Sequence, residues 1–365
     1  MKTIYDQKNS YIATFDEETG FSARSGILTE DGTETEIDPF GASFPELLDI
    51  GIMGHCKHGL SGLCLQSGVE CYQSGSNINA PNMSFENFKA IIDEIKGRTF
   101  QIALGGRGDP DQHEDFIKIL QYSSESGVVP NFTTSGLGLH KIHLPAIKRF
   151  CGAVAVSYYR NEYTDKAIEM LTDYGIKTNI HYVLSKSTIK EAIEILSSKR
   201  YFDRINRIIF LLHKPVGLGT VHNMLSVENP DVAEFFKYIG IPEIAEKCGF
   251  DSCSVPALLN FTENLLPESI EPCEAARFSA YISPDFKLYP CSFEQNLKQS
   301  VDLSTFSVEA AWNSETFNDF RKRFERRCTS CTNYPLCYGG CPVIPEITIC
   351  KQLNDERRGY IENKN

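Results

Sequence analysis

The sequence predicts an α/β protein whose strands form a parallel sheet. From residue 47 onward, short apolar runs of strand length alternate with longer segments whose apolar residues recur at helical spacing. This alternation gives six strand–helix units between residues 46 and 247. Repeated units of this kind imply parallel strands joined by right-handed crossovers, arranged either as an open sheet or as a barrel.

Turn and capping residues set the boundaries of these elements. Ser84 precedes the first helical segment and suits an N-cap. Pro145 predicts a helix start or bend in the third helical segment, and Thr188 with Glu191 predicts a capping box. The predicted strands are 47–53, 99–106, 128–136, 152–159, 177–185 and 205–212. The predicted helices are 84–97, 112–127, 138–150, 164–175, 188–200 and 229–240.

Composition limits the class of function. The 365 residues suffice for two domains, or for one large domain with an extension, and 41% hydrophobic and 23% charged residues are ordinary for a globular chain. The net charge of −12 argues against a general nucleic-acid binder and against binding to anionic membranes. The N-terminal segment has no apolar core and no apolar run reaches the length of a membrane span, so we expect a cytoplasmic protein without a signal peptide.

Thirteen cysteines are unusual for a chain in a reducing compartment, where disulfide bonds are disfavoured. Metal or redox chemistry is the better interpretation. Cys56, Cys64 and Cys71 lie in one glycine-rich loop after strand 47–53. Cysteine thiolates hold iron–sulfur clusters, and three thiolates on a four-iron cluster leave one iron to bind a cofactor. A structural zinc site or three unrelated thiols are the alternatives for this loop.

Seven further cysteines lie between residues 273 and 350. The most specific spacing is Cys328-x2-Cys331-x5-Cys337-x3-Cys341, because CxxC pairs present two sulfurs to one metal centre. Glycine and proline residues within this segment suit a loop that wraps around such a centre. Upstream, SAYIS and KLYPC predict the two strands of a hairpin. A zinc knuckle is the alternative.

Glycines and polar residues recur where the predicted strands end, and ligands bind at that edge of parallel α/β folds. Glycine lets the backbone approach a ligand closely, and a carboxylate can accept from a cation. These residues also have purely structural explanations. Glycine pairs and Asp-Pro sequences often form turns, and a histidine in a strand is more often part of a core than a ligand. The candidates are Gly105, Gly106, Asp109, Ser157, Asn179, His181 and Gly217.

The two ends of the chain carry weaker patterns. Residues 1–45 predict an N-terminal extension with a hairpin that turns at 17–20. We interpret it as a cap over one end of the sheet, with an edge for docking a partner peptide as the alternative. The basic run 321–327 is interpreted as a solvated helix face, with a contact for an acidic substrate segment as the alternative.

Together these residues resemble the radical S-adenosylmethionine (SAM) enzymes that carry a C-terminal SPASM domain. The resemblance spans residues 46–350. It implies a partial (β/α)6 TIM-like barrel and a C-terminal cysteine-rich iron–sulfur domain, with a short N-terminal β-hairpin extension. The implied boundaries are 1–45 for the extension, 46–247 for the barrel and 248–365 for the SPASM domain.

The resemblance also implies three [4Fe–4S] clusters. The SAM-binding cluster would take Cys56, Cys64 and Cys71, although their C-x7-C-x6-C spacing departs from the C-x3-C-x2-C of the family. We interpret the extra residues as insertions, and a cluster held by Cys56, Cys71 and another ligand is the alternative. The implied ligands of auxiliary cluster I are Cys273, Cys291 and Cys341, with Cys253 as the candidate fourth. Those of auxiliary cluster II are Cys328, Cys331, Cys337 and Cys350. Phe286 stands where the family usually has a glycine in the hairpin turn.

By the same resemblance, the candidate residues at the strand ends would contact SAM. Enzymes of this family cleave SAM to a 5′-deoxyadenosyl radical, which abstracts a hydrogen atom from the substrate. The expected substrate is a ribosomally made precursor peptide, and the expected partner is an external one-electron donor such as a flavodoxin or ferredoxin. Crosslinking, epimerisation and backbone excision all fit this chemistry.

Three alternative functions differ in what they predict. A sulfatase-maturase-like enzyme would form formylglycine from cysteine or serine by the same SAM chemistry. A zinc-stabilised peptide-binding module would bind zinc and would not cleave SAM. An electron-transfer protein would hold clusters without a cofactor pocket at the strand ends, which the alternating strand–helix region disfavours.

Overall fold

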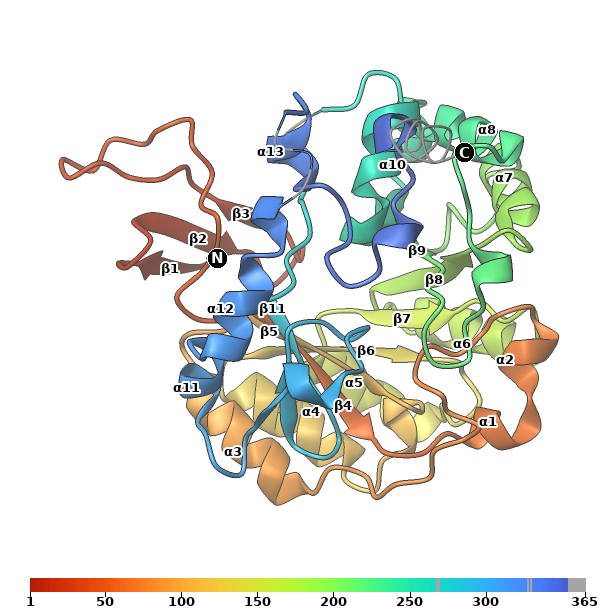
Figure 1. Cartoon of the computed structure of the whole chain (residues 1–365). Helices are drawn as coiled ribbons and strands as arrows, with labels where there is room; N and C mark the ends of the chain where they lie inside the picture. Colours follow the sequence, from red (N-terminus) through yellow and green to blue (C-terminus); the bar gives the residue numbers. More distant parts are fainter. Residues whose placement is uncertain (267–269, 327, 329, 354–365) are drawn as a thin grey trace. The chain divides into compact units, whose positions relative to one another are not determined.

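The computed structural model describes residues 1–266, 270–326, 328 and 330–353 (Figure 1). The contacts divide the chain into two units. Unit 1 comprises Met1–Gly62, Ser74–Thr178 and Glu274–Lys322, and unit 2 comprises Leu63–Gln73, Asn179–Cys273 and Arg323–Asn365. Residues 354–365 at the end of the predicted SPASM domain and Arg327 of the basic run lie outside the described residues. The predicted domain boundaries stay a prediction.

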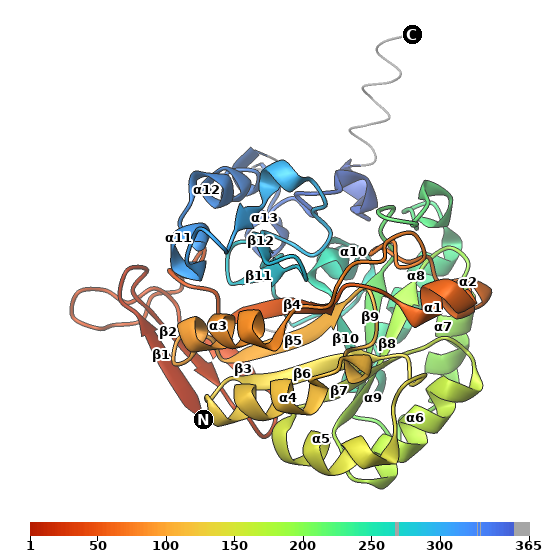
Figure 2. The same cartoon turned by 90° about the horizontal axis from the view of Figure 1, so that it is seen from below.

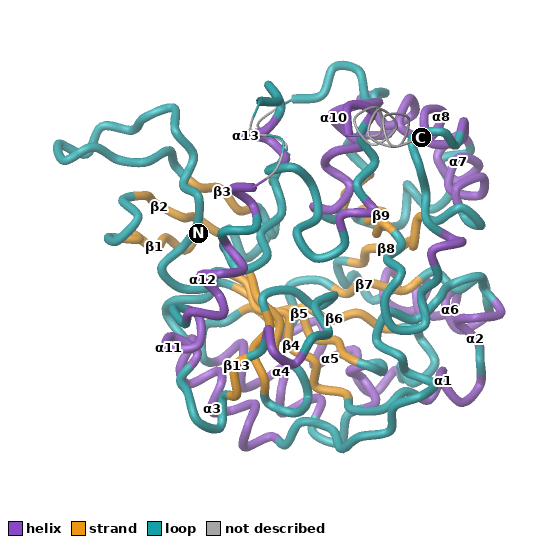
Figure 3. The backbone as a smooth tube through the Cα atoms, viewed as in Figure 1, coloured by secondary structure: helices purple, strands orange, loops and turns teal. Residues whose placement is uncertain are grey.

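Unit 1 is built on a sheet with the strand order β7-β6-β5-β4-β11-β12-β13. Strands β4 to β7 are parallel, β11 runs parallel to β4, and β12 and β13 continue antiparallel. Figure 3 marks strands β4 to β7 in orange. The strands are β4 (Leu47–Met53), β5 (Gln101–Gly106), β6 (Val129–Thr134), β7 (Val154–Ser157), β11 (Ser279–Ile282), β12 (Lys287–Tyr289) and β13 (Val301–Asp302).

Helices connect the parallel strands of unit 1 in the predicted order. Figure 2 shows α3, α4 and α5 side by side along one face of the sheet. The apolar residues of α3 recur at helical spacing and are buried, which is why this segment forms an amphipathic helix. The helices of unit 1 are α1 (Lys57–Ser61), α3 (Phe85–Ile95), α4 (Phe116–Glu125), α5 (Leu144–Phe150), α6 (Glu162–Asp173), α11 (Val308–Trp312) and α12 (Glu315–Arg321).

Unit 2 contains three parallel strands in the order β10-β9-β8. All six predicted strands are therefore present as β4 to β9, and the predicted α/β class is confirmed. Strand β10 was not predicted, because three residues are too short for a periodic signal. The strands are β8 (Thr178–Leu184), β9 (Arg207–Leu212) and β10 (Cys248–Phe250). The helices are α2 (Leu63–Gln66), α7 (Ile189–Ser197), α8 (Pro230–Ile239), α9 (Pro242–Ala245), α10 (Val255–Phe261) and α13 (Tyr334–Cys337).

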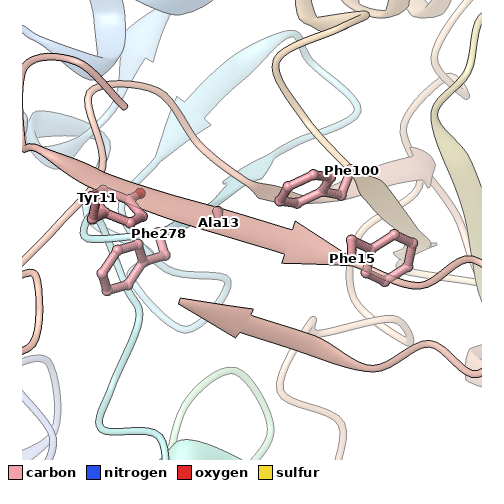
Figure 4. Packing of buried hydrophobic residues seen from close by; sticks show 5 residues of the cluster. All are labelled: Tyr11, Ala13, Phe15, Phe100 and Phe278. Atoms are coloured by element: carbon pink, nitrogen blue, oxygen red, sulfur yellow. The ribbon is translucent and has the colours of Figure 1, made fainter. Parts of the chain in front are cut away.

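The N-terminal extension forms a separate three-stranded antiparallel sheet. Its strands are β1 (Lys2–Asp6), β2 (Tyr11–Phe15) and β3 (Ser22–Arg24), so the predicted hairpin is confirmed as β2–β3. Alternate residues of β2 pack on Phe100 and Phe278, which precede β5 and β11 (Figure 4). Glu46, which precedes β4, accepts from the Tyr11 hydroxyl at 2.6 Å and pairs with Arg24 at 2.8 Å. The extension thus packs at the amino ends of these strands.

Local signals at the helix starts have mixed outcomes. The Ser84 hydroxyl accepts from the amide of Asn87 at 3.2 Å, as predicted for an N-cap, and α5 starts with Pro145 in its first turn. The capping box predicted at Thr188 is wrong. The Thr188 hydroxyl donates to the carbonyl of Val183 at 2.7 Å, and the Glu191 carboxylate accepts from Tyr182 at 3.0 Å. Hydrogen bonds back to strand residues Val183 and Tyr182 have therefore replaced those of a capping box.

The predicted hairpin after residue 278 is present as β11 and β12. Phe286 lies in its turn with φ +63°, in the left-handed region that favours glycine. The main chain of the turn is tied to Leu303, whose amide donates to the Phe286 carbonyl at 2.9 Å. A phenylalanine in this conformation costs about 1 kcal/mol, so the turn carries local strain. In the described part of the chain, no helix is long and apolar enough to span a membrane.

Candidate functional site

Cys56 follows the carboxyl end of β4 and caps helix α1. Its backbone is extended, and its Sγ accepts from the amide of Gly59 at 3.3 Å. A sulfur that accepts at a helix start suits the thiolate form, because the backbone amides there point at it. The sequence therefore places the first cysteine of the loop at a helix start, where its sulfur accepts a backbone hydrogen bond.

Glycines surround Cys56 so closely that side chains would not fit. A Cβ on Gly54 would lie 2.0 Å from the carbonyl oxygen of Pro81, and one on Gly108 would lie 2.4 Å from that of His55. A Cβ on Gly75 would meet the Cβ of Cys56 at 3.0 Å. The segments of Gly75 and Gly108 therefore approach Cys56 through backbone alone, which limits how far Cys56 can move.

The two candidate glycines at the end of β5 differ from one another. Gly106 has φ +116°, and a Cβ there would lie 2.8 Å from the carbonyl oxygen of Met53, so β4 and β5 require this glycine. A Cβ on Gly105 would meet nothing within 4 Å. Packing therefore does not require Gly105, and the space beside it is available to a ligand.

Asp109 is held by groups from two neighbouring elements of unit 1. Ser135, directly after β6, donates its amide to Asp109 Oδ1 at 3.0 Å and its hydroxyl to Oδ2. His58 of α1 approaches the same Oδ2 at 3.5 Å and also contacts the Ser135 hydroxyl. This network links the loop of Cys56 to the carboxyl ends of β5 and β6. Sequence reasoning missed His58 and Ser135, since contacts between distant segments leave no periodic signal.

Asp111 is a second carboxylate in this region that the sequence did not single out. It is 4% exposed, and neither carboxylate oxygen accepts a hydrogen bond of good geometry, although the side chain of Thr134 lies close enough to lower its pKa. Burial, together with the neighbouring carboxylate of Asp109, raises the pKa of Asp111 to about 7. A buried carboxylate whose oxygens accept no strong hydrogen bond suits a cationic ligand such as an amino group.

Three other candidates lie on β7 and β8. Ser157 ends β7, where its carbonyl accepts from Thr164 at 3.2 Å. His181 lies in the middle of β8, and burial lowers its pKa to about 4, so it is neutral at pH 7. Asn179 lies at the amino end of β8, where its side-chain oxygen accepts from Asn206 at 2.8 Å. This placement does not support a role for Asn179 in binding SAM, because ligands bind at the carboxyl ends of parallel strands.

Gly217 packs against the backbone of the third cysteine of the first loop. It has φ +64°, and a Cβ would lie 2.3 Å from the carbonyl oxygen of Tyr72. The next amide, of Leu218, donates to the carbonyl of Cys71 at 2.9 Å. Cys64 is buried in the short helix α2. Because Cys56 belongs to unit 1 and the other two cysteines to unit 2, the shared cluster of the three stays a prediction.

Four cysteines of unit 2 line one cavity of about 50 Å³. They are Cys328, Cys331, Cys337 and Cys350, the four residues expected to hold auxiliary cluster II. Burial and the three neighbouring thiols raise the pKa of Cys337. Gly339 and Gly340 have positive φ values and bend the chain around this cavity. The donor set of four thiols fits an iron–sulfur cluster.

Two of the cysteines expected to hold auxiliary cluster I are in direct contact. Cys253 shares a hydrogen bond with Cys341, and the Cys341 sulfur accepts from the amide of Ile344 at 3.2 Å. Cys273 and Cys291 fall in different units. All thirteen cysteines lie in the described part of the chain, and none of them forms a disulfide bond. Among the described residues, no group of three or more His, Cys, Asp or Glu side chains is placed closely enough to hold a metal ion. The cluster assignments therefore stay proposals.

Comparisons with known proteins agree with this arrangement. Residues 273–333 match the SPASM family, an iron–sulfur cluster-binding domain. Mycofactocin maturase MftC of Mycolicibacterium smegmatis is 22% identical over 324 residues, which cover 77% of this chain and 76% of the relative. Its counterpart from Mycobacterium tuberculosis strain H37Rv is 24% identical over 305 residues, with the same coverage of 77% and 76%.

Solved structures share the fold. Streptococcus suis SuiB bound to S-adenosylmethionine has a TM-score of 0.62 at 16% identity, covering 82% of this chain and 73% of SuiB. The enzyme anSMEcpe, with bound AdoMet and the Cp18Cys peptide, has a TM-score of 0.62 at 14% identity, covering 87% of this chain and 97% of anSMEcpe. The SPASM match, the parallel strands and these similarities in sequence and fold support the resemblance of the chain to radical SAM enzymes with a C-terminal SPASM domain.

Proposed function

We propose that this protein modifies a ribosomally made precursor peptide by radical chemistry that starts from SAM. The observation that carries the proposal is the convergence of four thiols on one cavity, partly inside the matched SPASM region. The relatives are named maturases, and one SuiB structure contains the precursor peptide SuiA. The candidate reactions are crosslinking, epimerisation and backbone excision.

The proposed cofactors are SAM and three [4Fe–4S] clusters. Cys56, Cys64 and Cys71 would hold the cluster that binds SAM. Auxiliary cluster I would be held by Cys253, Cys273, Cys291 and Cys341. The contact between Cys253 and Cys341 supports this assignment. Cys328, Cys331, Cys337 and Cys350 would hold auxiliary cluster II around their shared cavity. An external flavodoxin or ferredoxin would supply electrons, and the expected location is the cytoplasm.

When bound, SAM and a reduced cluster together supply the radical that abstracts a hydrogen atom from the substrate. The residues of this chain would bind SAM and orient it. The space beside Gly105 admits the backbone approach of a ligand, and the buried carboxylate of Asp111 suits an amino group. Ser135 and His58 fix Asp109 at the same edge of the sheet. His181, neutral at pH 7, can donate or accept a hydrogen bond without adding charge.

The test is a SAM-cleavage assay on anaerobically purified and reconstituted protein with a strong one-electron reductant. The expected product is 5′-deoxyadenosine, and Cys71→Ala is expected to abolish its formation. Cys151→Ala is the matched control, since Cys151 belongs to none of the three proposed ligand sets and burial raises the pKa of its thiol. A wild-type protein loaded with iron that forms no 5′-deoxyadenosine would refute the proposal.

The second candidate function is formylglycine formation. The anSMEcpe structure with a bound peptide has the same TM-score with this chain as SuiB has, 0.62. The match covers 97% of the anSMEcpe chain. Both candidates predict SAM cleavage, so the substrate distinguishes them. Conversion of a synthetic cysteine-containing sulfatase peptide, followed by mass spectrometry, would favour formylglycine formation. Failure with that peptide, while SAM is still cleaved, favours a precursor peptide.

A further inference from the structure

Asp49 is a carboxylate in the middle of β4 that the site described above does not use. Its neighbours in the strand, Leu48 and Ile50, are 0% exposed and lie on one side of the sheet. Successive residues of a strand point to opposite faces, so Asp49 points to the other face, where it is only partly buried. Parallel strands usually read as continuous apolar runs, so a charged residue within one calls for a chemical explanation.

The Asp49 carboxylate has no hydrogen bond and no ion pair within the described part of the chain. The carboxylate of Glu274 acts on it through space and is itself paired with Arg24 at 2.6 Å. Burial and this like charge raise the pKa of Asp49 to about 7. An ionised carboxylate can only accept hydrogen bonds, so a cation brought by a ligand would stabilise it here.

The positions around Asp49 on the same face leave space on one side. In the parallel register, Asp49 lies beside Ala103 of β5 and beside Tyr281 of β11. The next pair of positions on this face, toward the carboxyl ends, is Gly51 with Gly105. A Cβ on Gly105 would meet nothing within 4 Å, whereas one on Gly51 would lie 2.5 Å from the Tyr281 hydroxyl. Tyr281 therefore borders the side toward β11, and small residues border the side toward β5.

This arrangement fits a long side chain with a positive end. The charged end would pair with the Asp49 carboxylate, and the aliphatic stem would lie against the Tyr281 ring, whose face also attracts cations. Two residues of a strand span about 7 Å, so a group held at Asp49 lies about that far along the strand from the position of Gly105, where SAM is expected. A substrate residue bound there is therefore held close to the cofactor.

We propose that Asp49 binds a cationic side chain of the peptide substrate and so selects the part of the peptide that is presented to SAM. The inference rests on the proposed function, because it requires a peptide substrate. Lysine and arginine share the chemistry that Asp49 selects. Asp49 is a specificity-determining residue in this role, which differs from that of Asp111, proposed for the amino group of SAM.

The experiment compares two probe peptides on the reconstituted holoenzyme with SAM and without reductant. Both are capped alanine pentapeptides with one different central residue, which is lysine in the first and its uncharged analogue norleucine in the second. Their dissociation constants are measured by nuclear magnetic resonance titration. The wild-type protein is expected to bind the lysine peptide at least about tenfold more tightly, because charge-assisted hydrogen bonds to a desolvated carboxylate are strong.

Asp49→Asn keeps the shape of the side chain and removes its charge. It is expected to reduce the preference for lysine to less than about twofold, because a neutral amide no longer forms the charge-assisted pair. Asp319→Asn is the matched control, since the Asp319 carboxylate is 58% exposed and pairs with Lys322 on the surface. It is expected to keep the preference of the wild type.

The outcomes separate this inference from the proposed function. Reconstituted wild-type protein that forms no 5′-deoxyadenosine from SAM and a reductant would refute the proposed function. If SAM is cleaved, a wild-type protein that binds neither peptide, or binds both equally, would overturn the inference without any variant. A preference for lysine that survives in Asp49→Asn would overturn it as well. So would an Asp49→Asn protein whose only change is weaker binding of SAM, since Asp49 would then contact the cofactor.

Discussion

Gly54 tests whether the loop around Cys56 is packed as tightly as its geometry requires. In Gly54→Ala the new Cβ would lie 2.0 Å and 2.5 Å from the carbonyl oxygens of Pro81 and Ala80. Ordinary carbon–oxygen contacts are about 3.3 Å, so the opposing backbone must move by about 1 Å. That movement breaks the hydrogen bonds of Gly54 with Asn82 at 3.0 Å and with Ala80 at 3.1 Å.

Each lost hydrogen bond costs about 1 kcal/mol, and overpacking adds about 1 kcal/mol or more. The sum of about 3 kcal/mol corresponds to a change of more than about a hundredfold in the population of the native loop. The assay is the iron content after anaerobic reconstitution, with thermal unfolding of the apoprotein measured by circular dichroism. Gly54→Ala is expected to lose about four iron atoms per chain and to unfold at a lower temperature.

Gly105→Ala is the matched control, because a Cβ there meets nothing within 4 Å. It is expected to keep its iron and its thermal stability and to bind SAM more weakly. A Gly54→Ala protein with the iron content and unfolding temperature of the wild type would refute the reasoning about the loop.

Three further predictions address other parts of the chain. Asp111→Asn should stabilise the apoprotein at pH 8 by up to about 4 kcal/mol. The pKa of Asp111 is about 7 in the folded protein and 3.8 in the unfolded chain, so at pH 8 ionisation of this carboxyl opposes folding. This gain in stability should shrink as the pH falls from 7 and vanish below pH 3.8, which thermal unfolding measured across that range would check. The same variant should bind SAM more weakly. Cys337→Ser should lose the iron of one cluster and Cys151→Ser should lose none, as measured by iron analysis; equal losses would contradict the assignment of the four-cysteine cavity. Phe286→Gly relieves a left-handed φ but loses packing and adds backbone entropy, so it should change stability by less than about 1 kcal/mol and leave the iron content unchanged.

The sequence predicted the order of strands and helices because burial of one face imposes a period that can be counted. Strands β4 to β9 and the helices between them follow that period. Strand β10 does not, because three residues show no period. The capping box at Thr188 failed for another reason, since its hydroxyl bonds to Val183 rather than to its own helix.

The family resemblance, and not spacing alone, assigned the cysteines to clusters, and those assignments stay a prediction. The CxxC segment and Cys350 do converge on one cavity, and Cys253 does contact Cys341. The contacts of Asp109 with Ser135 and of Lys214 with Asp251 join residues 26 and 37 positions apart. Such contacts depend on how the strands align at one edge of the sheet, and a single sequence does not encode that alignment in any local pattern.

The most direct test of the central claim is a metal analysis combined with electron paramagnetic resonance on one anaerobically reconstituted and reduced sample, with and without SAM. The account predicts iron rather than zinc, and a cluster signal that changes when SAM is added and is lost in Cys56→Ala. Zinc in place of iron, or iron clusters whose signals ignore SAM, would contradict it and would favour a peptide-binding module or an electron carrier.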